Sequence, residues 1–261
     1  MTFRTRTHSR TGTLIAAAGG TALLVVALSG CGSTDVEGAP AEHKSFAFSG
    51  KTLTIDAGNS SLDLVPADGK QVEVTRRVDG WVVLGNGPDA SWKLEGDKLT
   101  LKVKCDALIS DCTSHHRVEV PRGVALSVNA DNGKVTASGF DTRLVLDSDN
   151  GGILVRDSSG PLQLKSDNGS VVAEEFSGSS VVARSDNGSI RLGVTGVPDL
   201  VDTVSDNGGI TIDLPKGDGP YAVTAEADNG DVSVDVPRSD NSPHVVKARS
   251  DNGEVTVRSA N

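Results

Sequence analysis

The stretch from Leu162 to Ala173 reads Leu-Gln-Leu-Lys-Ser-Asp-Asn-Gly-Ser-Val-Val-Ala, and this short segment decides the fold. Leu162 and Leu164 alternate with polar residues before the Asp-Asn-Gly, and Val171 and Ala173 stand at alternate positions after it. A period of two is typical of a strand with one buried face, and Asp, Asn and Gly favour turns. The segment therefore predicts a strand, a turn and a second strand.

This unit is repeated along the second half of the chain. Asp-Asn-Gly occurs seven times, at spacings of 18, 18, 19, 20, 22 and 23 residues. The residues two and four positions after each Gly, and five positions before each Asp, are apolar in every copy. Repeats of this length are typical of solenoids, in which each copy forms one coil. The copies are Asp131-Asn132-Gly133, Asp149-Asn150-Gly151, Asp167-Asn168-Gly169, Asp186-Asn187-Gly188, Asp206-Asn207-Gly208, Asp228-Asn229-Gly230 and Asp251-Asn252-Gly253.

The repeat predicts an all-β fold, and two topologies satisfy it. We favour a single-stranded parallel β-solenoid (β-helix) of about seven coils, each of 18–23 residues, with an irregular β cap at its N-terminal side. The alternative is an antiparallel β-meander or sandwich, since Asn-Gly between alternating apolar residues is also a strong hairpin signal. The inward positions carry almost only Val, Ile, Leu and Ala, which suits a narrow stacked interior better than a sandwich core.

Each residue of the Asp-Asn-Gly turn has an expected structural role. Gly adopts the left-handed backbone conformation without a clash, and Asn tolerates it better than most residues. The Asp carboxylate can accept a hydrogen bond from the backbone two residues on, and stacked Asn side chains can form an amide ladder. The functional alternative is weak Ca²⁺ binding along this edge. Each turn offers one carboxylate where calcium takes about six to eight oxygens, so we expect no cofactor.

Residues 44–124 are β-rich but irregular, and they predict wider first coils or a cap. Apolar residues alternate here too, for example at Leu53 and Ile55. An uncovered solenoid end would expose an apolar edge, so a cap is expected. Trp81 and Trp92 are expected to be buried in this cap, and the alternative is a sugar-stacking patch.

Two of the three cysteines lie close together in this region. Cys105 and Cys112 enclose six residues, and two thiols of an exported chain are expected to form a disulfide. The neighbouring His115-His116 suggests a zinc site instead. Adjacent histidines on a strand point in opposite directions, however, and thiols outside the cell oxidise. We therefore predict a Cys105–Cys112 disulfide and no metal site.

Residues 1–30 predict a lipoprotein signal peptide. Three arginines precede the apolar stretch Leu14–Leu28, which as a helix is about 22 Å long and too short to span a bilayer. Its end, Leu28-Ser29-Gly30-Cys31, resembles the lipobox of bacterial lipoproteins. The resemblance implies cleavage before Cys31 and acylation of its sulfur and new N-terminus, which anchors a protein to the extracytoplasmic face of the cell membrane. The alternative is an ordinary secretory signal with an incidental cysteine.

The mature chain is expected to have three parts. Residues 31–43 are small and polar, so they predict a flexible tether from the lipidated Cys31. Residues 44–124 form the irregular β cap, and residues 125–261 form the repeat solenoid.

Composition and motifs exclude several classes of function. The chain carries 35 acidic and 25 basic residues and only 3% aromatic residues, which argues against a nucleic-acid-binding protein. It contains no nucleophile elbow, Walker loop, dinucleotide glycine motif or His-Glu-x-x-His motif. We therefore expect no enzyme. A carbohydrate-active enzyme is the remote alternative, because some β-helical proteins cleave polysaccharides.

The repeated motif Asp-Asn-Gly-x-(Val/Ile)-x-(Val/Ala) also resembles a known family. Between about Phe46 and Val257 the chain is similar to the bacterial adhesin-like β-solenoid family, a domain of unknown function. The resemblance implies a surface β-solenoid of the kind often found on lipoproteins and envelope-stress membrane proteins. It offers no catalytic residues to carry over.

The expected function is a lipid-anchored module that binds a protein or glycan partner. The repeat lengthens between its strands, and loops that grow on one edge of a solenoid are a natural binding face, although that edge also tolerates insertions without a function. Tyr221, the only tyrosine, lies in one such loop. The alternative is a structural or envelope-stress-sensing scaffold that pairs with a partner at an exposed last coil, Glu254–Arg258. The lengthened segments are Gly193–Leu200, Asp213–Ala222 and Asp235–Val245.

Overall fold

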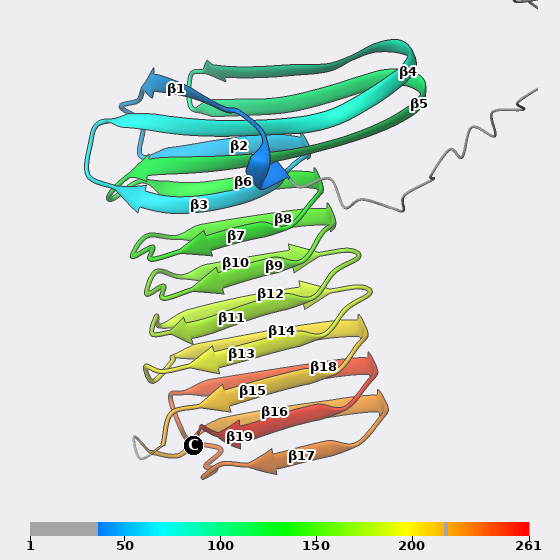
Figure 1. Ribbon diagram of the computed structural model, residues 1–261. Helices are drawn as coiled ribbons and strands as arrows, with labels where there is room; N and C mark the ends of the chain where they lie inside the picture. The colour runs from blue at the N-terminus through cyan, green and yellow to red at the C-terminus, as the bar shows by residue number, and fades with distance from the viewer. Residues whose placement is uncertain (1–35, 217–218, 261) are drawn as a thin grey trace, which may run out of the picture. The chain divides into compact units, whose positions relative to one another are not determined.

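The computed structural model describes residues 36–216 and 219–260 of the chain (Figure 1). Among them it places one short 3-10 helix, η1 (Val36–Gly38), and 19 β-strands. No helix in this part is long and apolar enough to cross a membrane. The strands are β1 (Ala41–Ala47), β2 (Thr52–Asn59), β3 (Ser61–Ala67), β4 (Gln71–Glu95), β5 (Lys98–Pro121), β6 (Ala125–Asn132), β7 (Val135–Ser138), β8 (Leu144–Asn150), β9 (Ile153–Arg156), β10 (Leu162–Ser166), β11 (Val171–Phe176), β12 (Ser180–Ser185), β13 (Ile190–Val194), β14 (Leu200–Asn207), β15 (Ile210–Leu214), β16 (Ala222–Asn229), β17 (Val232–Asp235), β18 (Val245–Asn252) and β19 (Val255–Ser259).

The strands of the repeat form parallel coils, which is the topology that we favoured. The strand before each turn pairs in parallel with the same strand of a neighbouring copy, so that Leu126 lies beside Leu144 and Leu144 beside Leu162. The strand after each turn does the same, with Val135 beside Ile153. Two facing layers result, one containing β6, β8 and β10 and the other β7, β9 and β11 (Figure 1). The parallel solenoid is confirmed, and the antiparallel alternative is excluded.

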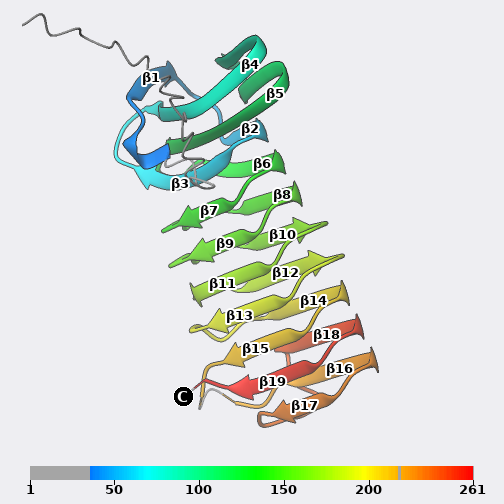
Figure 2. The ribbon, with the colours of Figure 1, turned by 45° about the vertical axis from the view of Figure 1, so that its right-hand side comes forward.

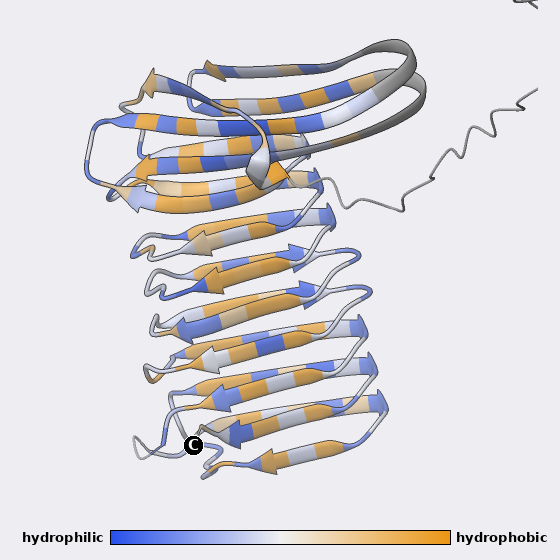
Figure 3. Ribbon diagram, viewed as in Figure 1, coloured by the Kyte–Doolittle hydropathy of each residue, from blue (hydrophilic) through white to orange (hydrophobic). Residues whose placement is uncertain are grey.

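The core lies between these two layers and is built from the alternating positions of the repeat. Figure 3 shows the hydrophobic positions recurring along the strands of successive coils. Burying each Val, Leu or Ile side chain contributes roughly 1.5–3 kcal/mol. Columns of equivalent apolar residues therefore hold the coils together. In six of the seven copies the residue two positions after Gly is at most 1% exposed: Val135, Ile153, Val171, Ile190, Ile210 and Val255.

The last two coils are stacked in the reverse of their order in the sequence. β18 lies between β14 and β16, and β19 lies between β15 and β17 (Figures 1 and 2). The coil β16–β17 therefore forms the end of the stack, and the last repeat fills the slot behind it. The expectation that Glu254–Arg258 forms an exposed last coil is wrong.

The longer connections make this order possible. The connection from β15 to β16 crosses the position that β18 and β19 fill, so it spans two strand spacings, or roughly 10 Å along the stack. Residues 236–244 then bring it back by one position to begin β18. Two of the three lengthened segments thus have a purpose in the topology.

A bent hairpin closes the other end of the stack. Residues 98–101 of β5 pair with β2 and residues 115–121 pair with β3. β4 runs antiparallel along β5, and β1 pairs with β4. β5 reaches both layers because it bends between these segments, where Cys105 and Cys112 form a disulfide with their Cα atoms 6.5 Å apart. This hairpin with β1 is named the cap.

Two boundaries differ from the expectation. β1 begins at Ala41, so residues 41–43 pair with β4, whereas the sequence predicts that they belong to the tether. β2 and β3 form a regular coil inside the region expected to be irregular, because they pair with β6 and β7. Their turn at Asn59 lacks the Asp-Asn-Gly sequence, which hid it from the repeat pattern. The described stack therefore contains eight coils.

Candidate functional site

The Asp-Asn-Gly turns line one edge of the stack and are joined by an asparagine amide ladder. Nδ2 of Asn168 donates to Oδ1 of Asn150 at 3.0 Å, and Asn187 donates to Asn168 at the same distance. From Asn150 onward, each amide also donates to the backbone carbonyl of an Asp in the neighbouring coil, at 3.2 Å for Asn168. These bonds tie each turn to the next one. The ladder continues, in spatial order, through Asn207, Asn252 and Asn229.

Close stacking, rather than a left-handed backbone, explains the glycines of these turns. Of the seven, only Gly133 has a positive φ, at 113°, and none of the turn asparagines has one. A Cβ at Gly188 or Gly208 would collide with the carbonyl oxygen of the turn glycine one coil away. The expected left-handed conformation is therefore wrong for six of the seven glycines. Neighbouring backbones leave no room for a side chain there.

Sequence reasoning missed a buried serine that precedes five of the turns. Oγ of Ser166 donates to the carbonyl of Gly151 at 2.9 Å, and Ser250 donates to Gly208 at the same distance. These bonds satisfy glycine carbonyls at the edge of the core. The extended motif Ser-Asp-Asn-Gly, present in five copies, was the signal available for it.

Several carboxylates of this edge pair with basic side chains. Lys165 donates to Asp167 at 2.5 Å, and Arg249 donates to Asp228 at 3.0 Å and to Asp251 at 3.2 Å. The hydrogen bond to Asp251 raises the pKa of Arg249. The sequence predicts that each of these carboxylates accepts a hydrogen bond from the backbone of its own turn. In the structure, these three carboxylates accept hydrogen bonds from neighbouring Lys and Arg side chains. Within residues 36–216 and 219–260, no group of three His, Cys, Asp or Glu side chains is placed to hold a metal ion.

The lengthened loops on the opposite edge are tied to one another. Tyr221 is only 2% exposed, its hydroxyl donates to the Pro215 carbonyl at 3.4 Å, and its ring packs edge-on against His244. His244 in turn bonds the Pro198 carbonyl through Nδ1 at 3.0 Å. The backbone of Tyr221 also donates to the carbonyl of Pro237 at 2.9 Å. Tyr221 therefore fastens the connections that reverse the coil order, and its buried side chain is not available to a partner on the surface of the loop.

The coil β16–β17, named the open end, differs from the other coils of the repeat in burial. Val232 is 45% exposed, whereas Val255 at the same position of the adjacent coil is fully buried. Val223, Ala225 and Val234 occupy inward positions and are only partly buried. Among the described strands, β16 pairs with β18 alone and β17 with β19 alone. The open end therefore presents both an uncovered core and unpaired strand edges.

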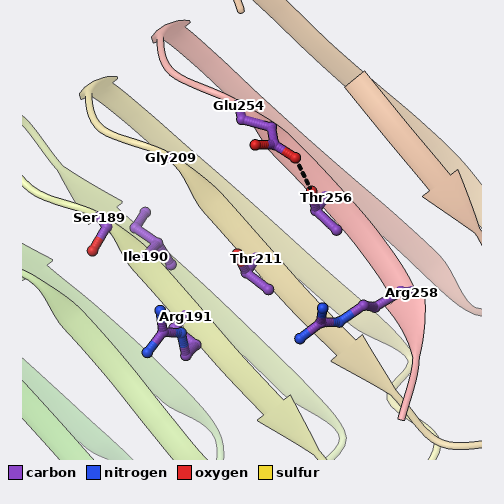
Figure 4. A pocket seen from close by; sticks show the side chains of 8 residues that line it. All are labelled: Ser189, Ile190, Arg191, Gly209, Thr211, Glu254, Thr256 and Arg258. Carbon is purple, nitrogen blue, oxygen red and sulfur yellow. Dashed lines mark hydrogen bonds between the residues drawn. The ribbon is translucent and has the colours of Figure 1, made fainter. Parts of the chain in front are cut away.

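A shallow groove lies on the outer face of the layer beside the open end. It encloses about 630 Å³ over β13, β15 and β19 (Figure 4). Arg258 is held by Asp213 at 2.6 Å, and Thr256 donates to Glu254 at 2.8 Å. Arg191 is the cation of this groove for which the described residues provide no ion-pair partner. The groove is thus an open polar surface with much of its bonding capacity already used.

The cap contains a buried histidine beside a buried arginine. His116 is fully buried, and neither ring nitrogen has a hydrogen-bond partner among the residues described. Burial, and then the nearby charges of Arg76 and His115, lower the pKa of His116 to about 4. Its ring is therefore neutral at pH 7. With both cysteines joined to each other, neither offers a free thiolate to a zinc ion.

The two tryptophans of the cap have different surroundings. Trp81 is 51% exposed, so its expected burial is wrong. It lies opposite Asp111, in the arm of the hairpin beyond the segments that pair with β2 and β3. Trp92 packs partly against the core, and the Arg76 guanidinium lies 4.1 Å from its ring centre. This cation occupies a face of Trp92 that sugar stacking would use.

Comparison with known families identifies the domain. The model of the Toastrack DUF4097 family matches residues 51–260. The chain belongs to this family. The Toastrack domain thus includes every described strand from β2 to β19, and the resemblance to an adhesin-like family of unknown function is confirmed. No curated protein matches the chain.

Several solved structures are similar to the Toastrack domain. A putative cell adhesion protein from Clostridium sporogenes is 11% identical, with a TM-score of 0.39 over 85% of this chain and 100% of that one. A putative adhesin from Bacteroides fragilis is 13% identical, with a TM-score of 0.30 over 85% and 97%. A putative adhesin from Parabacteroides merdae is 12% identical, with a TM-score of 0.32 over 85% and 96%.

The remaining expected site concerns the membrane anchor. Cys31 and the signal peptide of residues 1–30 lie outside the described residues. Lipidation of Cys31 stays a prediction from the lipobox.

Proposed function

We propose that this chain is a non-catalytic, lipid-anchored module of the cell envelope that binds a partner protein at the open end of its Toastrack domain. The similarity of Leu28-Ser29-Gly30-Cys31 to a lipobox supports the anchor. The Cys105–Cys112 disulfide supports a place outside the cytoplasm, where disulfides persist.

The exposure of Val232 is the observation that carries the binding function. The same repeat position is buried in every other copy, because another coil covers it on each side. An uncovered apolar column flanked by unpaired strand edges attracts further strands, and soluble proteins normally shield such features. The cap does this at the first end of the stack, whereas a bound partner would do it at the open end.

A protein partner fits this surface better than a glycan does. An open strand edge offers a row of backbone donors and acceptors, which is what another protein strand pairs with. Aromatic rings, by contrast, provide the broad apolar faces on which sugars stack. In the described part of the chain, the strongly exposed aromatic side chain is Trp81, which belongs to the cap. The loop edge is a weaker candidate because its loops are fastened to each other.

Site-specific photo-crosslinking in living cells tests the binding function. A benzoylphenylalanine at Ser233, on the open end, is expected to capture a partner protein after irradiation. The matched control is the same residue at Thr136, which occupies the equivalent position in β7, covered by β3 and β9. Equal capture from both positions, or capture from neither, would contradict the proposed binding surface.

Cell fractionation tests the anchor separately. The Cys31→Ala variant is expected to leave the membrane fraction, while the chain carrying the Cys105→Ala and Cys112→Ala substitutions is expected to stay there. Mass spectrometry of the wild-type N-terminal peptide should show a diacylglyceryl group on Cys31. A Cys31→Ala variant that remains membrane-bound would disprove the anchor and leave the binding surface untouched.

A further inference from the structure

The free edges of the open end can be assigned residue by residue. In a parallel pair, the N–H and C=O of one residue point to the same side of the strand, and the next residue points to the other side. The N–H of Ala222 donates to the carbonyl of His244, on the side of β18. The backbone groups of Val223, Ala225 and Ala227 therefore face the opposite side, which is the unpaired edge of β16. In β17 the carbonyl of Asp231 accepts from the N–H of Val255, so the backbone N–H and C=O groups of Val232 and Val234 face the open edge while their side chains occupy inward positions. These outward groups form a continuous hydrogen-bonding edge.

The side chains around this edge are acidic. The segment Ala222–Asp235 contains four acidic residues, Glu226, Asp228, Asp231 and Asp235, and no basic one. Arg249 from β18 lies 3.8 Å from Glu226 and 3.0 Å from Asp228, so a single cation serves both carboxylates and Asp251 as well. The open end therefore carries an excess of negative charge.

This charge disfavours a second copy of the chain as the occupant. If two open ends met with antiparallel strands, Glu226 and Asp228 of one copy would face the same residues of the other. Asp231 and Asp235 would meet in the same way across β17. Like charges directly opposite each other destabilise paired strands. At the first end of another copy, the edges of β2 and β3 already pair with β5 of the cap, so they are not free for a head-to-tail contact.

The strand on the covered side of β16 shows what fits beside it. In β18, Val246 and Ala248 point into the core at 0% and 2% exposure, while Lys247 and Arg249 point outward. Arg249 stands in register with Glu226. A small apolar residue every second position thus continues the core, and the basic residues between them meet the acidic row.

We propose that the open end binds an extended segment of a partner protein in which small apolar and basic residues alternate, added in parallel along β16. This inference rests on the proposed function and specifies its partner. The segment carries the pattern of β18: apolar residues cover Val223 and Ala225, and a basic residue lies beside Glu226. Its backbone bonds the outward groups of β16, as strands added to a sheet edge do.

The asparagine ladder gives the added segment a register. From Asn168 to the open end, each ladder amide donates both to an Asn Oδ1 and to an Asp carbonyl of the coil beside it, as Asn229 does to Asn252 at 3.2 Å and to Asp251 at 3.3 Å. At the end of the ladder, Oδ1 of Asn229 and the carbonyl of Asp228 are the corresponding acceptors, and both face the position of the added segment. A partner segment that ends with an Asn in this register extends the ladder by one step.

A peptide with the sequence of β18 is the probe. Fluorescein-labelled Val-Val-Lys-Ala-Arg-Ser-Asp-Asn is titrated with the mature full chain in detergent, and binding is followed by fluorescence anisotropy. The same peptide with Lys247→Glu and Arg249→Glu is expected to bind about tenfold more weakly or worse. In the chain, Glu226→Lys is expected to have a similar effect. Asp141→Lys, a charge reversal at an exposed residue between β7 and β8 and therefore far from the open end, is the matched control and should leave affinity unchanged.

An edge-blocking variant separates strand addition from simple charge attraction. Ala225→Pro removes an outward N–H that β18 does not use, so the stack is retained while the edge is blocked. Binding should be lost in this variant although its net charge is unchanged. Hydrogen exchange of β18 should stay the same when the peptide binds, since a loss of protection would mean that the peptide displaces β18. Equal affinity for Ala225→Pro and wild type, equal affinity for both peptides, displacement of β18, or no binding would each overturn the inference.

The two proposals can fail independently. If Ser233 captures a partner in cells but the peptide does not bind, the open end is a docking surface for another kind of partner. If Ser233 captures a second copy of this chain, the occupant is the chain itself and the basic segment is wrong.

Discussion

The two ends of the stack solve the same physical problem in opposite ways. At the first end, β5 pairs with both layers and β4 covers β5, so Leu53, Ile55 and Leu62 are at most 2% exposed. At the open end, β16 and β17 lie bare, and Val232 is 45% exposed. Both ends terminate the same columns of apolar side chains. Only one of them is shielded by the chain's own residues.

The order of the coils makes this contrast more informative. In the sequence, the open end (β16–β17) precedes the coil β18–β19. In the stack, β18 lies between β14 and β16, so the later coil supports the earlier one. The C-terminal repeat is thereby buried between two coils. The exposed surface is instead made by the internal segment Ala222–Asp235, which carries four acidic residues and no basic one.

Removing the last repeat should have the largest effect on the open end. In a chain that ends at His244, β16 and β17 lose the only strands that they pair with among those described. Two isolated strands are marginal in water, so their amides should exchange hydrogen at the rate of an unfolded chain. Hydrogen-exchange mass spectrometry reads this effect, and β6 to β13 should stay protected.

A shorter truncation is the control for this experiment. A chain that ends at Ser259 keeps β19 and should retain protection in every coil. If β16 and β17 stay protected without residues 245–261, the open end stacks directly on β14 and β15, and the reversed order is not needed for its stability.

At the capped end, the largest effect should come from acid. The pKa of His116 is about 4 in the folded protein because of burial, then Arg76 and His115, against about 6.5 when unfolded. The unfolded chain therefore binds a proton that the folded chain rejects, and stability falls as the pH drops from about 6.5 to about 4. The full loss is about 3 kcal/mol.

Urea unfolding of wild type and His116→Leu over this pH range measures the difference. The variant should lose less stability than wild type as the pH falls, since leucine carries no titrating group into the cap. Parallel pH profiles for the two proteins would mean that His116 is not held neutral in the core. The open end contains no histidine, so its exchange should not follow this transition.

The disulfide should stabilise the capped end by a slightly smaller amount. Cys105→Ser with Cys112→Ser opens a loop of about eight residues, which corresponds to about 2–3 kcal/mol in the chain-entropy account. Denaturant unfolding of the double variant and of reduced wild type should agree with each other. The increase in hydrogen exchange should be confined to β4 and β5, and an equal increase in β16 would contradict the independence of the two ends.

Much of the fold was predictable because the repeat carries its own alignment. Seven copies with equivalent apolar positions favour a stack in which equivalent residues lie side by side, and the asparagine ladder follows from that stacking. His116 had a signal as well. It stands two residues before Val118 in an alternating run, at a position where a buried side chain is expected.

The coil order could not be predicted from the same pattern. Val223 and Val246 occupy the same position in their copies, so either coil fits equally well beside β14. Only the connection lengths differ, and long loops indicate a binding edge as readily as a skipped coil. The backbone conformation of the turn glycines was predicted wrongly for a related reason, since the sequence of a single turn does not reveal how closely the next turn packs against it.

The smallest expected effect is the difference in unfolding free energy between the same Val→Ala substitution in two adjacent coils. Val255→Ala removes buried methyl groups between β15 and β17 and should cost about 2–3 kcal/mol, whereas Val232→Ala should cost less than about 1 kcal/mol because its side chain is already 45% exposed. Denaturant unfolding of both variants measures the two values. Adding the β18 peptide should then stabilise wild type more than Val232→Ala, because the bound segment buries Val232. If both substitutions cost the same without peptide, Val232 is already covered, and the contrast between the two ends disappears.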